Sequence, residues 1–533
     1  MVLVDREDAD LPTTGETLIF QRRLNGSSIN RLVLGLGLLL FSVASAQERP
    51  SSSNGNKSPE TSDESDEVLA AYSDAANYQT GGALVPAIEA WNSFLKEYPG
   101  SSLAPSAAHY LGVCHMQSDP ADYANAAKAF SKATQNKKYE LREESLANLG
   151  LCLFSMSNEL PEGDSQREQN FREVGSVYSR LLKEFPKSAF RDRAHFYRGE
   201  AAFALGEESQ AIKAYNRLLG DPQLRDSPLR CDALYARGVA QEQTGDVDSA
   251  ARSFGQYLDG CAKESLVDDV RLRLGDLAIA SENFDSALEY FDAVGDDASE
   301  EDSAYSLLRG AMALSRMGNA TAAARRYSTL TESFPDSIYA AEALLSAGRN
   351  YYSAGALDES TKAFERVLEQ EESDRSPIAA HWLARISLDQ AQPTRAVEFA
   401  NAWVDRSRGE DQIDLMIDLG DALAVVPQKM AESANWYEKA YQADVDGPSA
   451  PRALYNAAFS AIQAGDADRV LKLTKTFQDR FKEDELIDDV LFIRAETFLS
   501  REQAEPAEAI YDELLTMSPE TVEREQRANW VLR

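Results

Sequence analysis

The sequence predicts an all-α protein, an α-solenoid of about twelve helix pairs. Ala, Leu, Glu and Tyr are plentiful while Val and Ile are sparse, a composition that favours helices over strands. Apolar and small residues recur at helical spacing over residues 234–239 and 250–254, and Thr244, Gly245 and Asp246 supply turn chemistry between the two runs. The same frame returns every 35 to 39 residues along most of the chain, which is typical of a repeat array.

Each repeat has a small residue in its first helix and, in its second helix, a small residue followed four positions later by an aromatic one. The small residue lets the two helices approach closely, and the aromatic ring fills the space between neighbouring pairs. Because one pair cannot bury its apolar face alone, consecutive pairs must stack. The small residues of the first helices are Ala75, Gly112, Gly150, Gly199, Gly238, Gly275, Gly310, Gly348, Ala384, Gly420, Ala457 and Ala495.

One repeat contains an insertion, and several repeats end with a proline. The step from Gly150 to Gly199 is 49 residues and coincides with a polar insertion over residues 158–169. Prolines stand twelve positions after the small residue of several second helices, where we expect each to end a helix before the next repeat. These prolines are Pro99, Pro186, Pro335 and Pro519.

The charge balance excludes some classes of partner. The chain has 88 acidic and 54 basic residues, a net charge of -34. Nucleic acid is not expected to bind, because phosphate binding needs clustered Lys and Arg, and no such cluster stands out. An anionic membrane surface would repel the chain overall.

The first 46 residues predict an export signal. Three arginines precede an apolar run over residues 32–43, and a small-x-small pattern then places cleavage between Ala46 and Gln47. The run is short for a membrane span, so a cleaved signal is favoured over a permanent anchor, and no integral span is expected after cleavage. Residues 47–66 are rich in Ser, Pro, Asn and Glu and predict a disordered tether.

The solenoid is expected over residues 67–520, followed by a partial helix of a further repeat over residues 521–533. A half-repeat leaves its apolar side, with Trp530, uncovered. Either further residues complete the repeat, or a partner or a second copy of the chain covers this surface. The sequence therefore predicts self-association as one of these outcomes.

A search for chemistry finds no enzyme and no cofactor or metal site. The four histidines, His109, His115, His195 and His381, show no metal-ligand spacing and are expected to be partly buried or to line a groove. The chain has no phosphate-cradling glycine loop, nucleophile elbow or EF-hand spacing. No catalytic residue is proposed.

The four cysteines divide into two kinds. Cys114 and Cys152 hold equivalent places in consecutive first helices, about 9–10 Å apart and too far to bridge, so they predict buried free thiols. Cys231 opens the first helix of its repeat and Cys261 follows the end of the second. Those two ends lie side by side in an antiparallel hairpin, so the pair is either a disulfide, which an oxidising compartment allows, or two ordinary thiols.

The frame of Gly or Ala, then Ala, then Phe or Tyr, with a terminal Pro, resembles the tetratricopeptide repeat over residues 68–519. Three phrases, over residues 96–112, 183–199 and 332–348, share aromatic-Pro-x-Ser followed by Ala and Gly. They are similar to periplasmic tetratricopeptide proteins of the Tol–Pal cell-division coordinator type and to outer-membrane assembly lipoproteins. The resemblance implies a right-handed superhelix in an exported protein of the bacterial periplasm or cell envelope. The array is longer than in those proteins, and no lipid-bearing Cys follows the export signal.

The resemblance also implies which residues face a ligand. In the family, positions three before, one after and four after the small residue of the first helix lie on the concave surface. Aromatics flanked by carboxylates at these positions suit a basic or amphipathic segment. The alternative is that these aromatics only pack between neighbouring first helices. The predicted partner-binding residues are Phe196, Glu200, Phe203, Tyr235, Asp276, Arg349, Tyr352, Asp421, Phe492 and Glu496.

Two functions follow from these observations. The first is a non-enzymatic scaffold of the bacterial cell envelope that binds peptide segments or partner proteins on the solenoid. The second is a carrier or assembly module of an exported complex that handles cell-wall polymer or polysaccharide, with aromatic side chains stacking on sugars.

Overall fold

The computed structural model describes residues 64–370 and 374–516. These residues form 24 α-helices and one 3₁₀ turn, and no β-strand occurs among them. The predicted all-α solenoid and its number of helix pairs are confirmed. The predicted export signal, the tether up to residue 63 and the C-terminal segment 521–533 lie outside the described residues.

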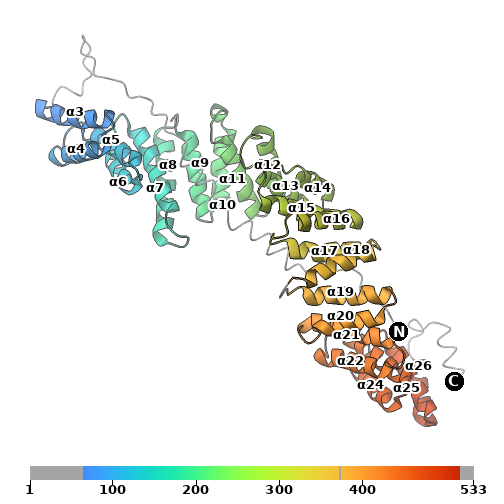
Figure 1. The fold of residues 1–533 in the computed structure, drawn as a ribbon. Coiled ribbons are helices and arrows are strands. Elements are labelled where there is room, and N and C mark those ends of the chain that lie inside the picture. Colours follow the sequence, from blue (N-terminus) through green and yellow to red (C-terminus); the bar gives the residue numbers. More distant parts are fainter. Residues whose placement is uncertain (1–63, 371–373, 517–533) are drawn as a thin grey trace. The chain divides into compact units, whose positions relative to one another are not determined.

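The chain divides into two compact units, an N-terminal one that ends at Leu277 and a C-terminal one that begins at Ala278. In the N-terminal unit each helix from α3 to α11 packs against the next helix in the chain (Figure 1). The helices of this unit are α3 (Asp66–Thr80), α4 (Leu84–Glu97), α5 (Ala104–Gln117), α6 (Tyr123–Ala133), α7 (Arg142–Asn158), α8 (Ser165–Glu184), α9 (Arg191–Ala204), α10 (Glu208–Gly220), η1 (Pro222–Leu224), α11 (Arg230–Gln243), α12 (Val247–Gly260) and α13 (Val267–Ala280).

The C-terminal unit repeats this arrangement, with every helix from α14 to α25 packed against the next. Its helices are α14 (Phe284–Asp292), α15 (Glu300–Arg316), α16 (Ala320–Ser333), α17 (Ala340–Ser353), α18 (Leu357–Leu368), α19 (Ser376–Asp389), α20 (Pro393–Trp403), α21 (Gly409–Ala424), α22 (Met430–Ala443), α23 (Ala450–Gln463), α24 (Ala467–Arg480), α25 (Ile487–Ser500) and α26 (Ala504–Thr516).

The turn between α11 and α12 follows from its sequence. Gly245 adopts φ +76°, a left-handed conformation that glycine accepts without steric cost. Asp246 then caps α12, because its carboxylate accepts a hydrogen bond from the Ser249 backbone N–H at 3.1 Å. Other repeats use a residue with positive φ at the same place, and in some of them it is not glycine. The turn residues of this kind are Gly82, Gly206, Gly318, Gly355, Gly465, Glu282, Ala391, Gln428 and Glu502.

The repeat glycine is required by the ring that lies on it. A Cβ added to Gly238 would lie 2.5 Å from the ring of Phe254, and one added to Gly348 would lie 2.6 Å from the ring of Phe364. These separations are shorter than van der Waals contact, so only glycine allows the two helices to pack at this distance. Gly310 differs, because an added Cβ there would meet the Arg326 guanidinium instead of a ring.

Two second helices have serine where the frame predicts alanine. The Ser360 hydroxyl donates to the Gly348 carbonyl at 2.7 Å, and the Ser433 hydroxyl donates to the Gly420 carbonyl at 2.8 Å. Both serines are fully buried. Their hydroxyls are therefore satisfied by the backbone of the first helix, so serine fits the small position without an unpaired polar group.

The phrase aromatic-Pro-x-Ser forms the turn between repeats. The hydroxyl oxygen of its serine accepts a hydrogen bond from the backbone N–H two residues later, at 3.0 Å for Ser101 and Ser188 and 3.2 Å for Ser337. The prolines of these phrases follow the ends of α4, α8 and α16 by two residues, as predicted. Pro519 lies outside the described residues.

The polar insertion of the third repeat lengthens its helices, giving 17 residues in α7 and 20 in α8, where α5 and α9 have 14 each.

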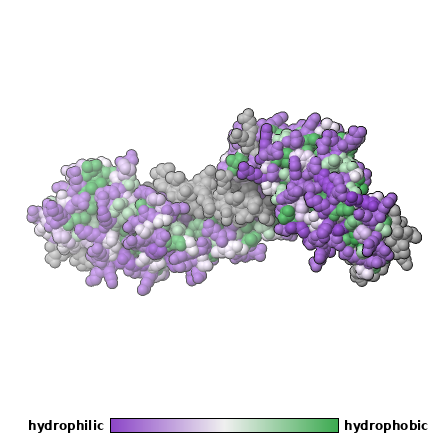
Figure 2. Space-filling model, turned by 90° about the horizontal axis from the view of Figure 1, so that it is seen from below, coloured by the Kyte–Doolittle hydropathy of each residue, from purple (hydrophilic) through white to green (hydrophobic). Residues whose placement is uncertain are grey.

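The hydrophobic core is a series of clusters, each shared by successive pairs within one unit. In the N-terminal unit one cluster covers buried residues from Val68 to Ala133 and a second covers those from Ala126 to Ala240. The face of the molecule seen in Figure 2 is mostly hydrophilic, with hydrophobic residues in small separate groups. Among the described residues, no helix combines the length and apolar character that crossing a membrane requires.

The cysteines are placed in two ways. Cys231 and Cys261 form a disulfide with a Cα–Cα distance of 5.9 Å, which joins the start of α11 to the residue after α12. Cys114 and Cys152 are free and buried. Burial raises the pKa of the Cys114 thiol to about 11, and that of Cys152 also rises for the same reason. Both free thiols therefore stay protonated and unreactive at neutral pH.

Candidate functional site on the first-helix face

The candidate site lies on the first-helix face, defined as the positions three before, one after and four after the small residue of successive first helices. Packing of these helices brings such positions together, since α19 contacts α21 directly and α7 contacts α9. Among the ten predicted residues four are buried and six are partly exposed. The buried ones are Phe196, Tyr235, Asp276 and Asp421; the partly exposed ones are Glu200, Phe203, Arg349, Tyr352, Phe492 and Glu496.

Phe196 and Tyr235 are core residues, and the prediction that they contact a partner is wrong. Each is 1% exposed. The Phe196 ring lies 6.2 Å from Tyr215, and the Tyr235 ring lies 6.1 Å from Phe254. The second-helix aromatic of the same pair therefore covers each of them. The alternative interpretation, that these aromatics pack between helices, holds for both.

Three carboxylates that follow the small residue are engaged within their own repeat. The hydroxyl of the second-helix tyrosine donates to them: Tyr215 to Glu200 at 2.6 Å, Tyr437 to Asp421, and Tyr511 to Glu496. Burial raises the pKa of Glu200 to about 7 and that of Asp421 to about 6. We conclude that the main role of these three carboxylates is to accept the hydrogen bond of a buried tyrosine hydroxyl. Glu200 and Glu496 are also partly exposed.

A buried ion cluster occupies the same face at the end of the N-terminal unit. Arg273 contacts Glu242 at 2.7 Å and Asp269 at 2.8 Å, and its guanidinium lies 5.7 Å from the centre of the Tyr235 ring. The Tyr235 hydroxyl donates to Asp269 at 2.8 Å. Asp276, on the same helix as Arg273, is 5% exposed. This cluster is closed to a large ligand, which removes Asp276 from the accessible part of the face.

Glu200 and Phe203 on α9 and Phe492 and Glu496 on α25 are partly exposed, but the part of the face where two partly exposed aromatics meet a carboxylate lies on α17, α19 and α21. The Tyr352 ring packs edge-on against Trp382 at 5.1 Å, and the Tyr352 hydroxyl donates to Asp389 at 2.8 Å. Trp382 is partly exposed and lies over Phe364, with 5.9 Å between ring centres. The prediction included Tyr352 but missed Trp382, which stands two positions before Ala384. In the neighbouring first helices that position is occupied by Ser346 and Asp418, so the frame alone did not mark an aromatic there.

An imidazole–carboxylate pair adjoins these aromatics. Nδ1 of His381 lies 2.8 Å from Oδ2 of Asp418 on the next first helix, α21. Burial alone would lower the pKa of His381, but the charge and hydrogen bond of Asp418, together with the charge of Asp414, raise it above its ordinary value. Asp389 is exposed and Asp414 partly exposed, so these two carboxylates border the aromatic surface, while Asp418 is 3% exposed and supports His381 from below the surface. We name this set the α17–α21 surface: Tyr352, His381, Trp382, Asp389, Asp414 and Asp418.

The other histidines have structural surroundings. His109 is buried against Ser145, with 2.8 Å between Nδ1 and Oγ, and burial lowers its pKa to about 4. His195 is half-buried and burial likewise lowers its pKa to about 4. Within residues 64–370 and 374–516, no three His, Cys, Asp or Glu side chains are arranged to hold a metal ion.

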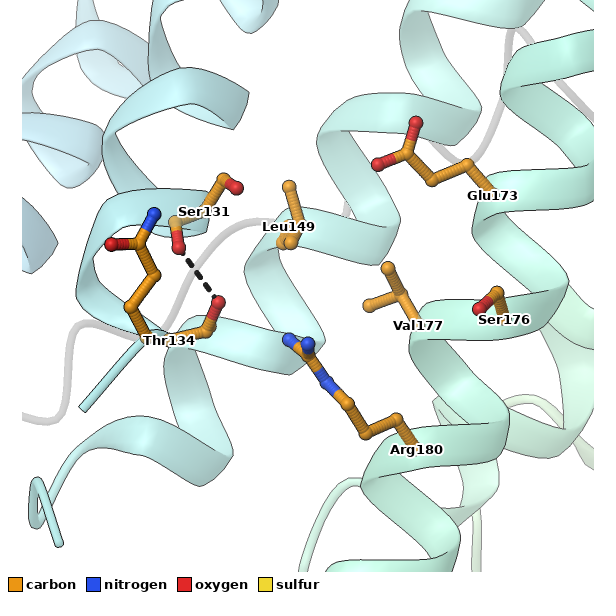
Figure 3. Close-up of a pocket in the computed structure, with 8 residues that line it drawn as sticks. Ser131, Thr134, Leu149, Glu173, Ser176, Val177 and Arg180 are labelled. Carbon is orange, nitrogen blue, oxygen red and sulfur yellow. Dashed lines mark hydrogen bonds between the residues drawn. The ribbon is translucent and has the colours of Figure 1, made fainter. Parts of the chain in front are cut away.

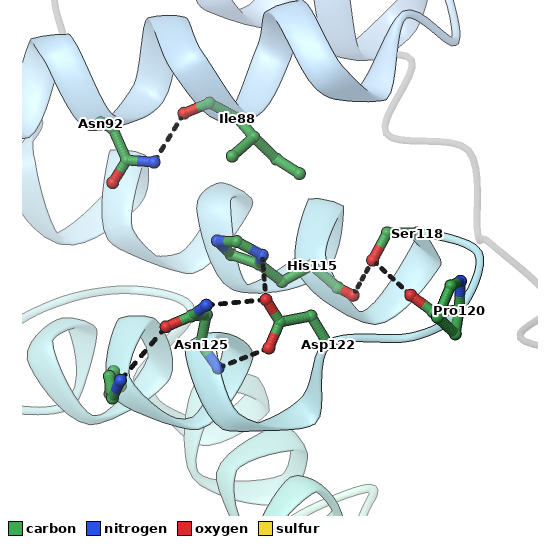
Figure 4. A network of polar contacts seen from close by, with 8 residues as sticks. Ile88, Asn92, His115, Ser118, Pro120, Asp122 and Asn125 are labelled. Atoms are coloured by element: carbon green, nitrogen blue, oxygen red, sulfur yellow. Dashed lines mark hydrogen bonds and ion pairs between the residues drawn. The ribbon is translucent and has the colours of Figure 1, made fainter.

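His115 takes part in the polar network shown in Figure 4. Its Nδ1 faces Oδ2 of Asp122 at 3.3 Å, and that carboxylate also accepts hydrogen bonds from the backbone and side chain of Asn125 at 3.0 and 2.7 Å. Asp122 is the cap of α6. His115 therefore supports a helix start, because it contacts the residue that satisfies the first N–H groups of α6.

Comparisons with known proteins agree with the repeat frame. A description of the tetratricopeptide repeat-like domain matches residues 297–448, and two descriptions of the tetratricopeptide repeat match residues 160–228 and 232–259. No curated protein matches the chain.

Solved structures resemble the chain at low identity. They include Naa15/Naa10 bound to HypK-THB, at 14% identity over 83% of this chain and 68% of that one, with a TM-score of 0.35. The APC/C hetero-tetramer Cut9-Hcn1 matches at 13% identity over 87% and 96%, with a TM-score of 0.30. Pseudomonas aeruginosa pilF matches at 17% identity over 45% and 95%, with a TM-score of 0.32. Likenesses this weak carry no argument about function.

Proposed function

Tetratricopeptide repeats occupy the matched segments of this chain, and on that premise we propose that the protein is a non-enzymatic protein–protein interaction scaffold. Its ligand is a basic or amphipathic segment of a partner protein, bound on the α17–α21 surface. The observation that carries this proposal is the pairing of partly exposed aromatics with carboxylates at Tyr352, Trp382 and Asp389. Aromatic area supplies affinity, and the carboxylates orient a cationic segment.

We favour a peptide over a polysaccharide because of how Trp382 is engaged. Its ring is stacked on Phe364, with an interplanar angle of 6°, and the Arg385 guanidinium lies 5.7 Å from its centre. A sugar binds to an aromatic platform through an open ring face. The contacts of Trp382 leave less ring area for such stacking, while Tyr352 and Asp389 still offer an edge and a charge to a basic side chain.

Our proposal also places the protein in the bacterial periplasm or cell envelope. Two observations support export: the apolar run over residues 32–43 with cleavage expected before Gln47, and the disulfide between Cys231 and Cys261, which is chemically stable only in an oxidising compartment. The three aromatic-Pro-x-Ser phrases resemble the Tol–Pal coordinator type, which we include in the proposal. N-terminal sequencing of the protein from an envelope fraction should return Gln47, whereas intact Met1 in the cytosol would contradict export.

Binding of a labelled oligolysine peptide, followed by fluorescence anisotropy, tests the ligand assignment. Tyr352→Ala combined with Asp389→Asn should raise the Kd about tenfold, since both groups of the proposed anchor are lost. Tyr78→Ala is the matched control, because Tyr78 is 48% exposed on α3, outside this surface. Equal affinity for the double variant and the control, with unchanged circular dichroism, would refute this site.

A further inference from the structure

A stretch of the second repeat has the opposite charge to the rest of the chain. From Tyr123 to Tyr139, which covers α6 and the loop after it, the chain has four lysines and no acidic residue, within a protein of net charge -34. All four are exposed, and no described carboxylate forms an ion pair with any of them. They are Lys128, Lys132, Lys137 and Lys138. This stretch is therefore a local basic surface on a protein whose net charge is strongly negative.

A hollow of about 210 Å³ opens beside this surface, between α6, α7 and α8 (Figure 3). Leu149 and Val177 are its buried apolar residues, and the other groups around it are polar. Figure 3 shows Thr134 and Ser131 approaching from the end of α6 and Arg180 reaching in from α8. The remaining lining residues are Gln135, Glu173 and Ser176.

Arg180 is the group in this hollow that lacks a counter-charge. Its neighbour Arg142 is satisfied, because Nε donates to the Thr134 carbonyl at 2.9 Å and the guanidinium pairs with Glu184. Arg180 has a buried Nε without a hydrogen-bond partner, and it forms no ion pair with any residue the structure describes. Glu184 pairs with Arg142 and not with Arg180, and Glu173, although it lines the hollow, forms no ion pair with either guanidinium. Burial lowers the pKa of Arg142, and the charge of Arg180 lowers it further.

We propose that this surface is a docking site for an acidic segment of a partner protein, with one Asp or Glu carboxylate of that segment on Arg180. Arg binds a carboxylate through parallel N–H donors, and the hydroxyls of Ser131 and Ser176 line the same hollow. The hollow is smaller than the roughly 300–1,000 Å³ of small-molecule sites, so it accepts a single side chain. The four lysines then contact the neighbouring carboxylates of the segment and steer its approach.

This site is separate from the α17–α21 surface in place and in charge. It is formed mainly by the second helices α6 and α8 of the N-terminal unit, with Leu149 from α7, while the α17–α21 surface belongs to first helices of the C-terminal unit. The scaffold would accordingly bind segments of opposite charge in its two units. Failure of either assignment leaves the other intact.

Fluorescence anisotropy with a labelled oligoglutamate peptide, in about 50 mM salt so that charge is only partly screened, tests the proposal on the full chain. Arg180→Leu and the double variant Lys137→Glu/Lys138→Glu should each raise the Kd about tenfold or more. Arg180→Lys keeps the charge without the fork of donors and should give a smaller loss. Arg172→Leu is the matched control, because Arg172 is on α8, 63% exposed and paired with Glu168, outside the hollow.

Two results would overturn the proposal. One is an unchanged Kd for both Arg180→Leu and the lysine double variant, with circular dichroism showing that each is folded. The other is no saturable binding of oligoglutamate by the unaltered protein, together with binding to vesicles rich in phosphatidylserine, which would assign the surface to lipid headgroups. Oligolysine binding should be unaffected in all these variants.

Discussion

Single residues in this array are selected by the side chain that lies directly against them. Gly238 is glycine because the Phe254 ring occupies the place of a Cβ. Ser360 and Ser433 are allowed because their hydroxyls reach the carbonyl of the paired glycine. Tyrosine replaces phenylalanine in three repeats that have a carboxylate after the small residue, so each of these tyrosine hydroxyls has an acceptor.

Replacing Gly238 with alanine should destabilise the fold. The added Cβ would lie 2.5 Å from Phe254, so the ring and α12 must shift, at a cost of about 1–3 kcal/mol of unfolding free energy. Gly255→Ala is the matched control, because nothing lies within 4 Å of a Cβ there, and it should stabilise α12 by up to about 1 kcal/mol. Thermal unfolding followed by circular dichroism measures both, and a neutral Gly238→Ala would disprove the close contact.

Asn456 is a polar residue at an apolar position. It is 2% exposed, and neither its amide nitrogen nor its amide oxygen has a hydrogen-bond partner among the described residues. Asn456→Leu should therefore raise the unfolding free energy by about 1–3 kcal/mol, since it removes an unsatisfied buried amide. A lower thermal midpoint would show that the amide is satisfied in solution. Leucine already occupies the equivalent place before the small residue in five first helices, at Leu111, Leu149, Leu274, Leu383 and Leu419.

Glu200 should make stability fall as pH rises. Its folded pKa of about 7 lies above the ordinary value of 4.5, so the folded state holds the proton more tightly than the unfolded state. Stability is therefore lost progressively between about pH 4.5 and pH 7 and stays reduced above that range. Glu200→Gln keeps an acceptor for Tyr215 and should raise the unfolding free energy by about 1–3 kcal/mol at pH 8 but little at pH 4.5. Parallel pH profiles for the two proteins would contradict this.

At the scale of elements, the turn inside each pair is the least optimised part of the array. The left-handed residue is glycine in several repeats but Glu282, Ala391, Gln428 or Glu502 in others. A non-glycine residue with φ near +60° costs about 1 kcal/mol. Turns between repeats rely instead on a serine or aspartate, such as Ser188 or Asp484, that accepts a hydrogen bond from the backbone N–H of the residue just before the next helix.

Ala391→Gly should stabilise the protein by about 1 kcal/mol, because φ is +56° at this turn and glycine removes the Cβ clash. The reverse change in the preceding repeat, Gly355→Ala, should destabilise by a similar amount, since φ there is +74°. Denaturant melts of the two variants beside the unaltered protein give the comparison. Effects of the same sign at both positions would contradict the shared turn geometry.

At the scale of the whole molecule, charge is the dominant feature. A net charge of -34 produces self-repulsion that opposes the folded state, while ion pairs such as Arg273 with Glu242 and Asp269 act locally against it. The basic stretch from Tyr123 to Tyr139 is hidden in this net charge, and it becomes evident only from the charges of residues that are close together on the surface. The overall charge balance, by contrast, predicts no cluster of Lys and Arg.

Added salt should stabilise this protein. Raising the ionic strength shortens the screening length from about 30 Å at 0.01 M to about 8 Å at 0.15 M, so repulsion between the acids weakens and the thermal midpoint should rise by about 2–4 °C. The increase should shrink near pH 5, close to the isoelectric point of 4.6. A midpoint that falls with salt at pH 7.5 would mean that ion pairs outweigh the net repulsion.

Local chemistry was enough to predict the repeat, the small residue of each first helix and the turn at Gly245 and Asp246, because these depend on residues close together in one helix pair. Exposure was not predictable in this way. Phe196 and His381 hold the same place in the frame, yet Phe196 is covered by Tyr215 while the His381 side chain is 21% exposed. A frame position sets the direction of a side chain around its helix, whereas the size and charge of side chains on neighbouring helices decide whether it meets solvent, and only the tertiary structure brings those side chains together.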